Sequence, residues 1–206
     1  MFLGMLAESG WPVAGLDFSL DAASIAWRQQ GVPAVCASPS RAPFSTGSCA
    51  AVTMFHVLEH LYDPQVCLEE AHRLLRPNGR LIVQVPNAAS WLFLLLGENW
   101  TGADVPRHLW LFRPRDLDAL LDGCGFEVVR YKHFSLRDNP ACLATSLVPW
   151  LDPMARRARG SHEGSLVTLF KDLLYFALVI ASLPCTLLEA ACRAGTTVTV
   201  EARKKK

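Results

Sequence analysis

A short polar segment carries two histidines and a glutamate at a spacing that suits metal binding or proton transfer. His56, Glu59 and His60 form H-x-x-E-H. Two histidines four residues apart on a helix can share a zinc ion while the glutamate activates water. The segment directly follows an apolar run, however, and Asp63-Pro64 soon ends it. A zinc hydrolase would need a long helix here and a third ligand, so we expect no metal at His56 and His60.

An acidic side chain near the N-terminus offers a second kind of chemistry. Asp17 ends the apolar run that begins at Pro12. An acid at the carboxyl end of a parallel strand can accept hydrogen bonds from both hydroxyls of a ribose. The alternative is a helix cap or a turn residue, and Asp17 alone does not decide between them.

The elements that must position these side chains alternate between strand and helix. Helices are predicted after a cap at Ser19 or Asp21, from Pro64 and from Pro114. Strands separated by single helices predict a mostly parallel sheet with right-handed crossovers. The expected strands are 12–17, 33–37, 50–55, 80–85, 126–131 and 196–202.

The stretch from Val52 to Asn87 resembles the class I S-adenosylmethionine-dependent methyltransferases, in particular the small-molecule type with H-x-x-E-H after the fourth strand. The resemblance implies an α/β, Rossmann-like sheet of seven strands, mostly parallel with an antiparallel last strand. This chain opens without the family's first strand and Gly-rich loop. It would therefore supply strands two to seven, and we expect the missing residues upstream of Met1.

The resemblance also assigns site residues. Asp17 matches the family's ribose-binding acid, and no acid stands after the third strand or at the start of the fourth, where the family usually has one. Arg107 and His108 would bind the acceptor or take its proton, with a loop-holding role as the alternative. The expected cofactor-binding residues are Asp17, Phe18, Ser38, Phe55 and His56; the expected acceptor-binding residues are Asn87, Arg107 and His108; the catalytic candidates are His56 and His108.

The implied function is methyl transfer from S-adenosylmethionine to a small-molecule acceptor, impaired in a chain that lacks the cofactor loop. The alternative is a non-catalytic relative of the fold that binds a partner or a membrane. For many methyl transfers positioning alone suffices, because the sulfonium is already a strong electrophile.

Net charge, cysteine spacing and the N-terminal residues limit the partners and the cell compartment that we expect. The 206 residues carry a net charge of +1, which gives no general attraction to nucleic acid. The seven cysteines form no C-x-x-C pair, so a zinc knuckle or disulfide framework is not expected. The N-terminus does not resemble a signal peptide, and we expect a cytoplasmic protein.

The last third of the chain differs from the rest. We expect a methyltransferase-like core at 1–138, a helical apolar insertion at 139–195, and a last strand with a basic tail at 196–206. Lys171 and Asp172 interrupt the apolar run 166–188, and the remaining run 173–188 is short for a spanning helix. With Arg156, Arg157, Arg159 and the terminal lysines, it predicts peripheral contact of 156–188 with the inner face of the membrane. A buried helix or a homodimer interface is the alternative.

Overall fold

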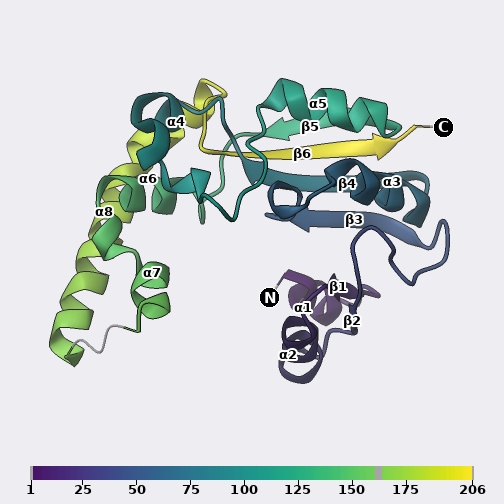
Figure 1. Cartoon of the computed structure of the whole chain (residues 1–206), viewed down its shortest axis with the longest axis horizontal. Helices are drawn as coiled ribbons and strands as arrows, with labels where there is room; N and C mark the ends of the chain where they lie inside the picture. Colours follow the sequence, from purple (N-terminus) through teal and green to yellow (C-terminus); the bar gives the residue numbers. More distant parts are fainter. Residues whose placement is uncertain (1, 161–163, 206) are drawn as a thin grey trace.

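The computed structural model describes residues 2–160 and 164–205, and its strands lie in two sheets (Figure 1). The strands are β1 (Gly15–Asp17), β2 (Ala34–Cys36), β3 (Cys49–Phe55), β4 (Leu75–Pro86), β5 (Phe126–Lys132) and β6 (Thr197–Lys204). The α-helices are α1 (Phe2–Glu8), α2 (Leu20–Gln30), α3 (Pro64–Leu74), α4 (Trp91–Leu96), α5 (Pro114–Gly123), α6 (Asn139–Leu147), α7 (Pro153–Ala158) and α8 (Ser165–Ala191). The 3-10 turns are η1 (Leu58–His60), η2 (Gly97–Asn99), η3 (Thr101–Ala103) and η4 (Pro149–Leu151).

The sheet order confirms the expected fold class. β1 pairs with β2 in parallel, and the larger sheet has the order β3-β4-β6-β5. β3 and β4 are parallel, while β6 is antiparallel to both of its neighbours, β4 and β5. The last strand therefore runs against the others, and helices α6 to α8 precede it in the chain.

The two sheets are not joined by strand pairing. β3 is an edge strand of the larger sheet, and β1 pairs only with β2 in the part of the chain that the structure describes. Ala50 and Ala51 of β3 are exposed, and Figure 1 shows the unit of α1, β1, α2 and β2 set apart from the larger sheet. The rings of Phe2 and Phe55 meet edge to face at 5.2 Å between centroids, which links α1 to the end of β3.

Helix starts follow from capping residues. The Ser19 hydroxyl accepts a hydrogen bond from the Ala22 N–H at the start of α2, as the sequence predicts. Asp63 caps α3 just ahead of Pro64, where the missing N–H of proline costs nothing. The chain therefore leaves β3 through a tight polar corner before it enters α3.

One apolar core holds the larger sheet against α3 and α5. Leu68 of α3, Leu81 of β4 and Leu117 of α5 are each 0% exposed and belong to one cluster. Burying a leucine fully contributes about 1.5–3 kcal/mol, so these contacts fix the helices on the sheet. They also fix the carboxyl ends of β3 and β4, where the polar corner lies.

Helix α8 is long, apolar and largely uncovered. Among the described residues it is the one helix long and apolar enough to cross a membrane. An 18-residue stretch of it has a mean hydropathy of 1.9, and 6% of that stretch is buried. It contacts α6, and the Ser182 hydroxyl donates to the Pro140 carbonyl at 3.1 Å. The alternative of a helix buried within its own chain is therefore wrong for most of α8.

The basic residues expected beside α8 are only partly there. Arg156 is 8% exposed and bonds Asp172 of α8, so it ties α7 to α8 instead of facing solvent. Lys204 donates to the carbonyls of His72 and Leu75, and the C-terminal end lies across the molecule from α8 (Figure 1). Lys206 lies outside the described residues. The expectation that Arg156, Lys204 and Lys205 flank α8 is therefore wrong. Arg157 on α7 and Arg159 just after it are exposed.

Candidate functional site

The polar corner after β3 is the centre of the candidate site. The His56 N–H donates to the Gln84 carbonyl, which ties the end of β3 to β4. His56 itself has φ 54°, a left-handed conformation that a residue other than glycine adopts at a cost and that clusters at functional sites. The turn η1 follows at once and carries Glu59 and His60.

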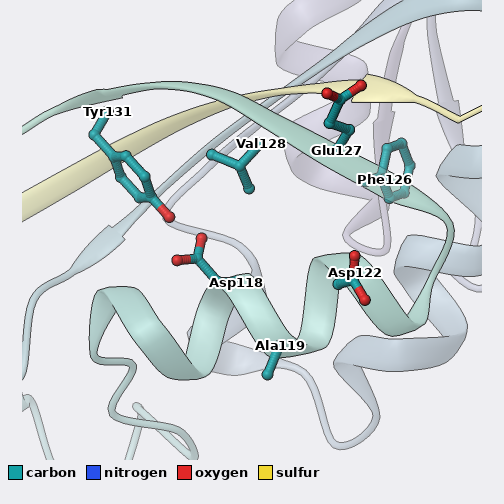
Figure 2. A pocket seen from close by; sticks show the side chains of 7 residues that line it. All are labelled: Asp118, Ala119, Asp122, Phe126, Glu127, Val128 and Tyr131. Carbon is teal, nitrogen blue, oxygen red and sulfur yellow. The ribbon is translucent and has the colours of Figure 1, made fainter.

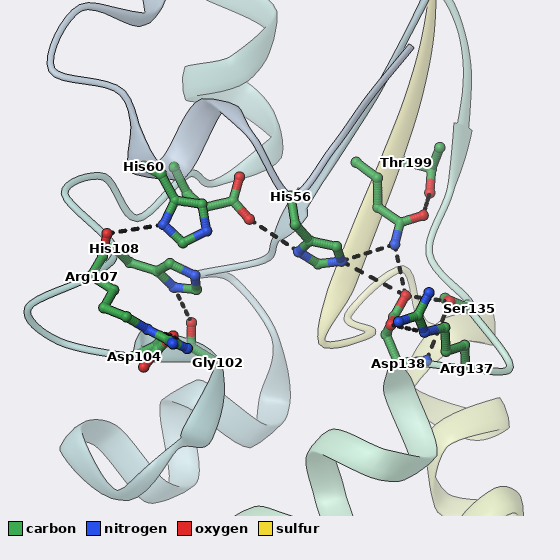
Figure 3. A network of polar contacts seen from close by, with 12 residues as sticks. His56, His60, Gly102, Asp104, Arg107, His108, Ser135, Arg137, Asp138 and Thr199 are labelled. Atoms are coloured by element: carbon green, nitrogen blue, oxygen red, sulfur yellow. Dashed lines mark hydrogen bonds and ion pairs between the residues drawn. The ribbon is translucent and has the colours of Figure 1, made fainter. Parts of the chain in front are cut away.

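The His56 ring lies between two carboxylates. Its Nδ1 donates to Glu59 Oε1 at 3.0 Å, and its Nε2 lies 3.8 Å from Asp138 Oδ2. Gln84 donates to Asp138 at 2.7 Å, places its amide nitrogen 3.0 Å from His56 Nε2, and accepts from Thr199 at 3.1 Å. Figure 3 shows His56 between the η1 side and the group around Asp138.

The carboxylates change the charge of His56. Burial lowers the pKa of its imidazole, but the hydrogen bonds and charges of Asp138 and Glu59 outweigh burial and raise the pKa to about 9. The pKa of Asp138 is lowered despite its burial, because His56, Ser135 and Gln84 bond it. The amide nitrogen of Gln84 works against this rise in the pKa of His56, because an amide N–H can donate only to an Nε2 that carries no proton. At neutral pH the two carboxylates thus favour an imidazolium, which donates a proton more readily than it accepts one.

A second polar group lies on the other side of η1. The His60 and His108 rings are 4.7 Å apart between centroids. His60 Nδ1 bonds the Arg107 carbonyl at 3.0 Å, and His108 Nδ1 bonds the Gly102 carbonyl at 2.9 Å. Glu59 Oε1 is taken by His56, while Glu59 Oε2 is buried without a hydrogen-bond partner. One ligand atom each of Glu59, His60 and His108 lie within 4.8 Å of one another.

Arg107 and Asn87, which were predicted to bind the acceptor, are both hydrogen-bonded within the chain. The Arg107 guanidinium bonds the Asp104 carboxylate, which raises the pKa of Arg107, and its side chain is 75% exposed. Asn87 is 0% exposed, donates to the Gly195 carbonyl and accepts from the Ala89 N–H. These contacts give Asn87 a structural role between β4 and β6, and its substrate role stays a prediction.

The residues predicted to bind the cofactor lie partly on the β1–β2 unit and partly on the larger sheet. Asp17 ends β1, and its Oδ1 accepts from the Ser19 N–H at 2.8 Å. Phe18 is 75% exposed, and the exposed Ser38 bonds Ser40. Phe55, next to His56, ends β3 and is 37% exposed. The structure gathers His56, Arg107, His108 and the η1 residues, whereas Asp17, Phe18 and Ser38 lie on the separate β1–β2 unit.

Sequence reasoning missed Gln84, Asp138 and Thr199. Gln84 and Thr199 lie on strands that the sequence locates, and Asp138 directly precedes α6, but nothing in the spacing along the chain brings them to His56. Alternation along β4 and β6 was the available signal, because it places Gln84 and Thr199 opposite each other in the pairing of these strands.

Another hollow lies away from these residues, between α5 and β5. Figure 2 shows Asp118 and Tyr131 turned toward each other there. Asp118 Oδ1 and the Tyr131 hydroxyl have no hydrogen-bond partner, and burial raises the pKa of Asp118. None of the lining residues is a predicted site residue.

Comparison with known proteins agrees with this architecture. A family model described as a methyltransferase domain matches residues 1–131. A demethylmenaquinone methyltransferase of Mycobacterium sp. (strain KMS) is 46% identical over 79 residues, which are 38% of this chain and 34% of that protein. A protein of Mycolicibacterium smegmatis named as a probable S-adenosylmethionine-dependent methyltransferase is 32% identical over 132 residues, covering 60% of this chain and 47% of that protein.

The solved structures show the same fold. A methyltransferase structure from Archaeoglobus fulgidus superposes with a TM-score of 0.59 at 18% identity, covering 98% of this chain and 80% of that one. At this identity the likeness concerns the fold alone. The chain spans less than half the length of either sequence relative above.

Proposed function

We propose that this chain, which belongs to the methyltransferase domain family matched by its residues 1–131, transfers a methyl group from S-adenosylmethionine to a small-molecule acceptor. One observation carries the proposal: the polar corner with His56, Glu59 and His60 stands directly after β3 in a methyltransferase sheet. In open α/β sheets, ligands bind beyond the carboxyl ends of the strands. The H-x-x-E-H segment would mark the small-molecule type of the family.

The residues at the end of β1 fit a nucleoside. Asp17 uses Oδ1 for the Ser19 N–H and has Oδ2 available for a ribose hydroxyl, and Phe18 beside it presents an exposed ring. We assign Asp17, Phe18, Ser38, Phe55 and His56 to the cofactor. When bound, S-adenosylmethionine supplies an electrophilic methyl group, and the chain's own residues need only hold the acceptor in line with it.

The acceptor side would lie at His108 and Arg107. His108 keeps its Nε2 without a hydrogen bond among the described residues, so it is the better candidate for taking a proton from an acceptor. His56, as an imidazolium between two carboxylates, would position the corner instead. The relative named a demethylmenaquinone methyltransferase makes a ring compound of quinone biosynthesis our first acceptor to test.

A complete cofactor site would need a strand between the two sheets. β1 and β3 each have a free edge in the described part of the chain, and a strand paired with both would join them into one sheet. The nucleotide sequence upstream of Met1 tests this proposal. An in-frame stop codon directly before Met1 would contradict it.

Cofactor binding separates this function from that of a non-catalytic fold relative. We would titrate S-adenosylmethionine and S-adenosylhomocysteine calorimetrically into the chain, and into the chain extended by any in-frame upstream residues. Asp17→Ala should weaken binding by roughly 1.5–3 kcal/mol, the range for a charged hydrogen bond. Asp21→Ala, on the exposed first turn of α2, is the matched control. No binding to either form would favour the non-catalytic relative.

The second role proposed here is peripheral membrane contact through α8. Exposed apolar side chains run along this helix, and two exposed cations precede it in the chain, Arg157 on α7 and Arg159 just after α7. Apolar area together with basic charge gives reversible binding to an anionic surface. If the protein is cytoplasmic and binds the inner face of the membrane, the lipid would cover the apolar side of α8. A homodimer formed through α8 would cover the same side.

A further inference from the structure

We propose that Glu59, His60 and His108 form a binding site for one divalent transition-metal ion. This site goes beyond methyl transfer and does not depend on it; it uses the same Nε2 of His108 as the proposed acceptor role, so a bound ion would exclude proton uptake by His108. It differs from the zinc site that the sequence argues against, because His56 is not a ligand. The third ligand, which the sequence left unidentified, is His108 from the loop before α5.

Both histidines are held in the form that binds metal. A carbonyl oxygen can only accept, so Nδ1 of His60 donates to Arg107 and Nδ1 of His108 donates to Gly102. In a neutral ring, the lone pair then belongs to Nε2. Metal-ligating histidines are typically fixed in this way, with the other ring nitrogen bonded to a carbonyl or carboxylate. Figure 3 shows the two rings side by side, each tied to its carbonyl.

Glu59 supplies an independent observation that points to a ligand. Its side chain is 0% exposed, and Oε2 has no hydrogen-bond partner although it is buried. Leaving a buried carboxylate oxygen without a hydrogen-bond partner is unfavourable. His56 holds the other oxygen at 3.0 Å, which restricts the orientation of the carboxylate, as hydrogen-bonding neighbours typically do for metal ligands.

The spacing suits an ion after a small contraction. Zinc binds histidine nitrogen and carboxylate oxygen at about 2.0–2.2 Å, which puts tetrahedral ligand atoms about 3.4 Å apart. The three ligand atoms here lie within 4.8 Å, so side-chain movements of about 1 Å close the site. The two ring nitrogens belong to η1 and to the loop after η3, outside the strands of the sheet.

Charge around the three ligands favours a cation. Glu59 contributes a negative charge, and the nearby cation of Arg107 is paired with Asp104. The His56 ring lies between Glu59 and Asp138 and is not one of the three ligands. Two nitrogen ligands and one carboxylate suit first-row ions such as Zn²⁺, and three protein ligands leave a position for water or an anionic oxygen.

Metal binding by the full chain tests the site. After chelator treatment, Zn²⁺ calorimetry should show one ion per chain, and Co²⁺ should give a visible spectrum of nitrogen and oxygen ligands without thiolate bands. Removing one of three ligands by His60→Ala or His108→Ala should weaken Zn²⁺ binding by at least the roughly 10–100-fold that losing a hydrogen-bond partner of a ligand already costs. Glu59→Gln, which keeps the size of the side chain, should do the same.

Controls exclude other sources of metal binding. His133→Ala removes a histidine of another part of the fold and should leave the affinity unchanged, and circular dichroism should show that each variant is folded. Thiolate bands in the Co²⁺ spectrum would assign the ion to cysteines and overturn the proposal. The proposal is also overturned if the chain binds no Zn²⁺, or if the folded His108→Ala variant binds Zn²⁺ as tightly as the parent chain does. None of these readouts depends on methyl transfer, so failure of the proposed function leaves this test intact.

Discussion

Oδ2 of Asp138 lies 3.8 Å from Nε2 of His56 and joins the start of α6 to the corner after β3. Both residues belong to the predicted core, and Asp138 is its last residue before the predicted insertion at 139–195. This contact makes the helical region part of the candidate site, since the charge on His56 depends on it. The domain limits at 138 and 195 stay a prediction.

Asp138→Asn should lower the pKa of His56 from about 9 toward its ordinary 6.5, because one of two stabilising charges is lost. Histidine proton resonances followed by NMR across pH 5–10 measure this directly. In the parent chain, a pKa raised on folding adds stability below pH 6.5 that is lost as pH rises through 9. Asp122→Asn, an exposed aspartate bonded to Lys205, should leave the His56 curve unchanged. An unshifted curve in Asp138→Asn would contradict the prediction.

Glu189→Gln should stabilise the protein at pH 7. Burial raises the pKa of Glu189, only partly opposed by the Leu92 N–H, and Oε2 has no partner. The raised pKa gives stability that is present below the usual glutamate range and is lost as pH rises through the folded value. A glutamine keeps an oxygen for the Leu92 N–H without the charge, so we expect about 1 kcal/mol more stability in urea unfolding at pH 7.

The gain from Glu189→Gln should shrink as the pH falls below the glutamate range. Glu98→Gln, on an exposed turn, is the control and should change little. A loss of stability at pH 7 would mean that the Glu189 carboxylate is stabilised by its surroundings.

Gly195→Ala should strongly destabilise the chain. An added Cβ would stand 1.9 Å from the His133 carbonyl oxygen and 2.8 Å from Asn139 Nδ2. Overpacking typically lowers the free energy of unfolding by about 1–3 kcal/mol. The nearest atoms that the added Cβ would meet belong to the His133 backbone, which has little room to move away. Gly123→Ala is the control, because nothing lies within 4 Å of its Cβ position. Equal urea midpoints for the two variants would refute the close contact at Gly195.

The purified chain should float with vesicles that contain anionic lipid. High salt should release part of it, since Arg157 and Arg159 each add about 1 kcal/mol near such a surface and salt screens them. Carbonate should extract it, unlike a spanning helix. Phe170→Asp on α8 should abolish flotation, whereas Leu136→Asp, exposed outside α8, should not. Failure to float with anionic or neutral vesicles would favour a homodimer, which sedimentation analysis can detect.

Local sequence patterns determined the elements and their order. Ser19, Pro64 and Pro114 mark helix starts where the structure has them, because caps and proline act on the nearest turn of backbone. Apolar runs located the strands for the same reason. The polar corner at His56 was also visible, since it follows directly on a strand.

Tertiary structure alone decided which side chains meet. Asp138 reaches His56, and His108 reaches His60, across long stretches of chain whose path depends on how α3, α5 and α6 pack. It also decided that Arg156 is buried against Asp172 and that Lys204 caps α3. Sequence spacing cannot supply such contacts, because they result from the packing of whole elements and not from the preferences of neighbouring residues.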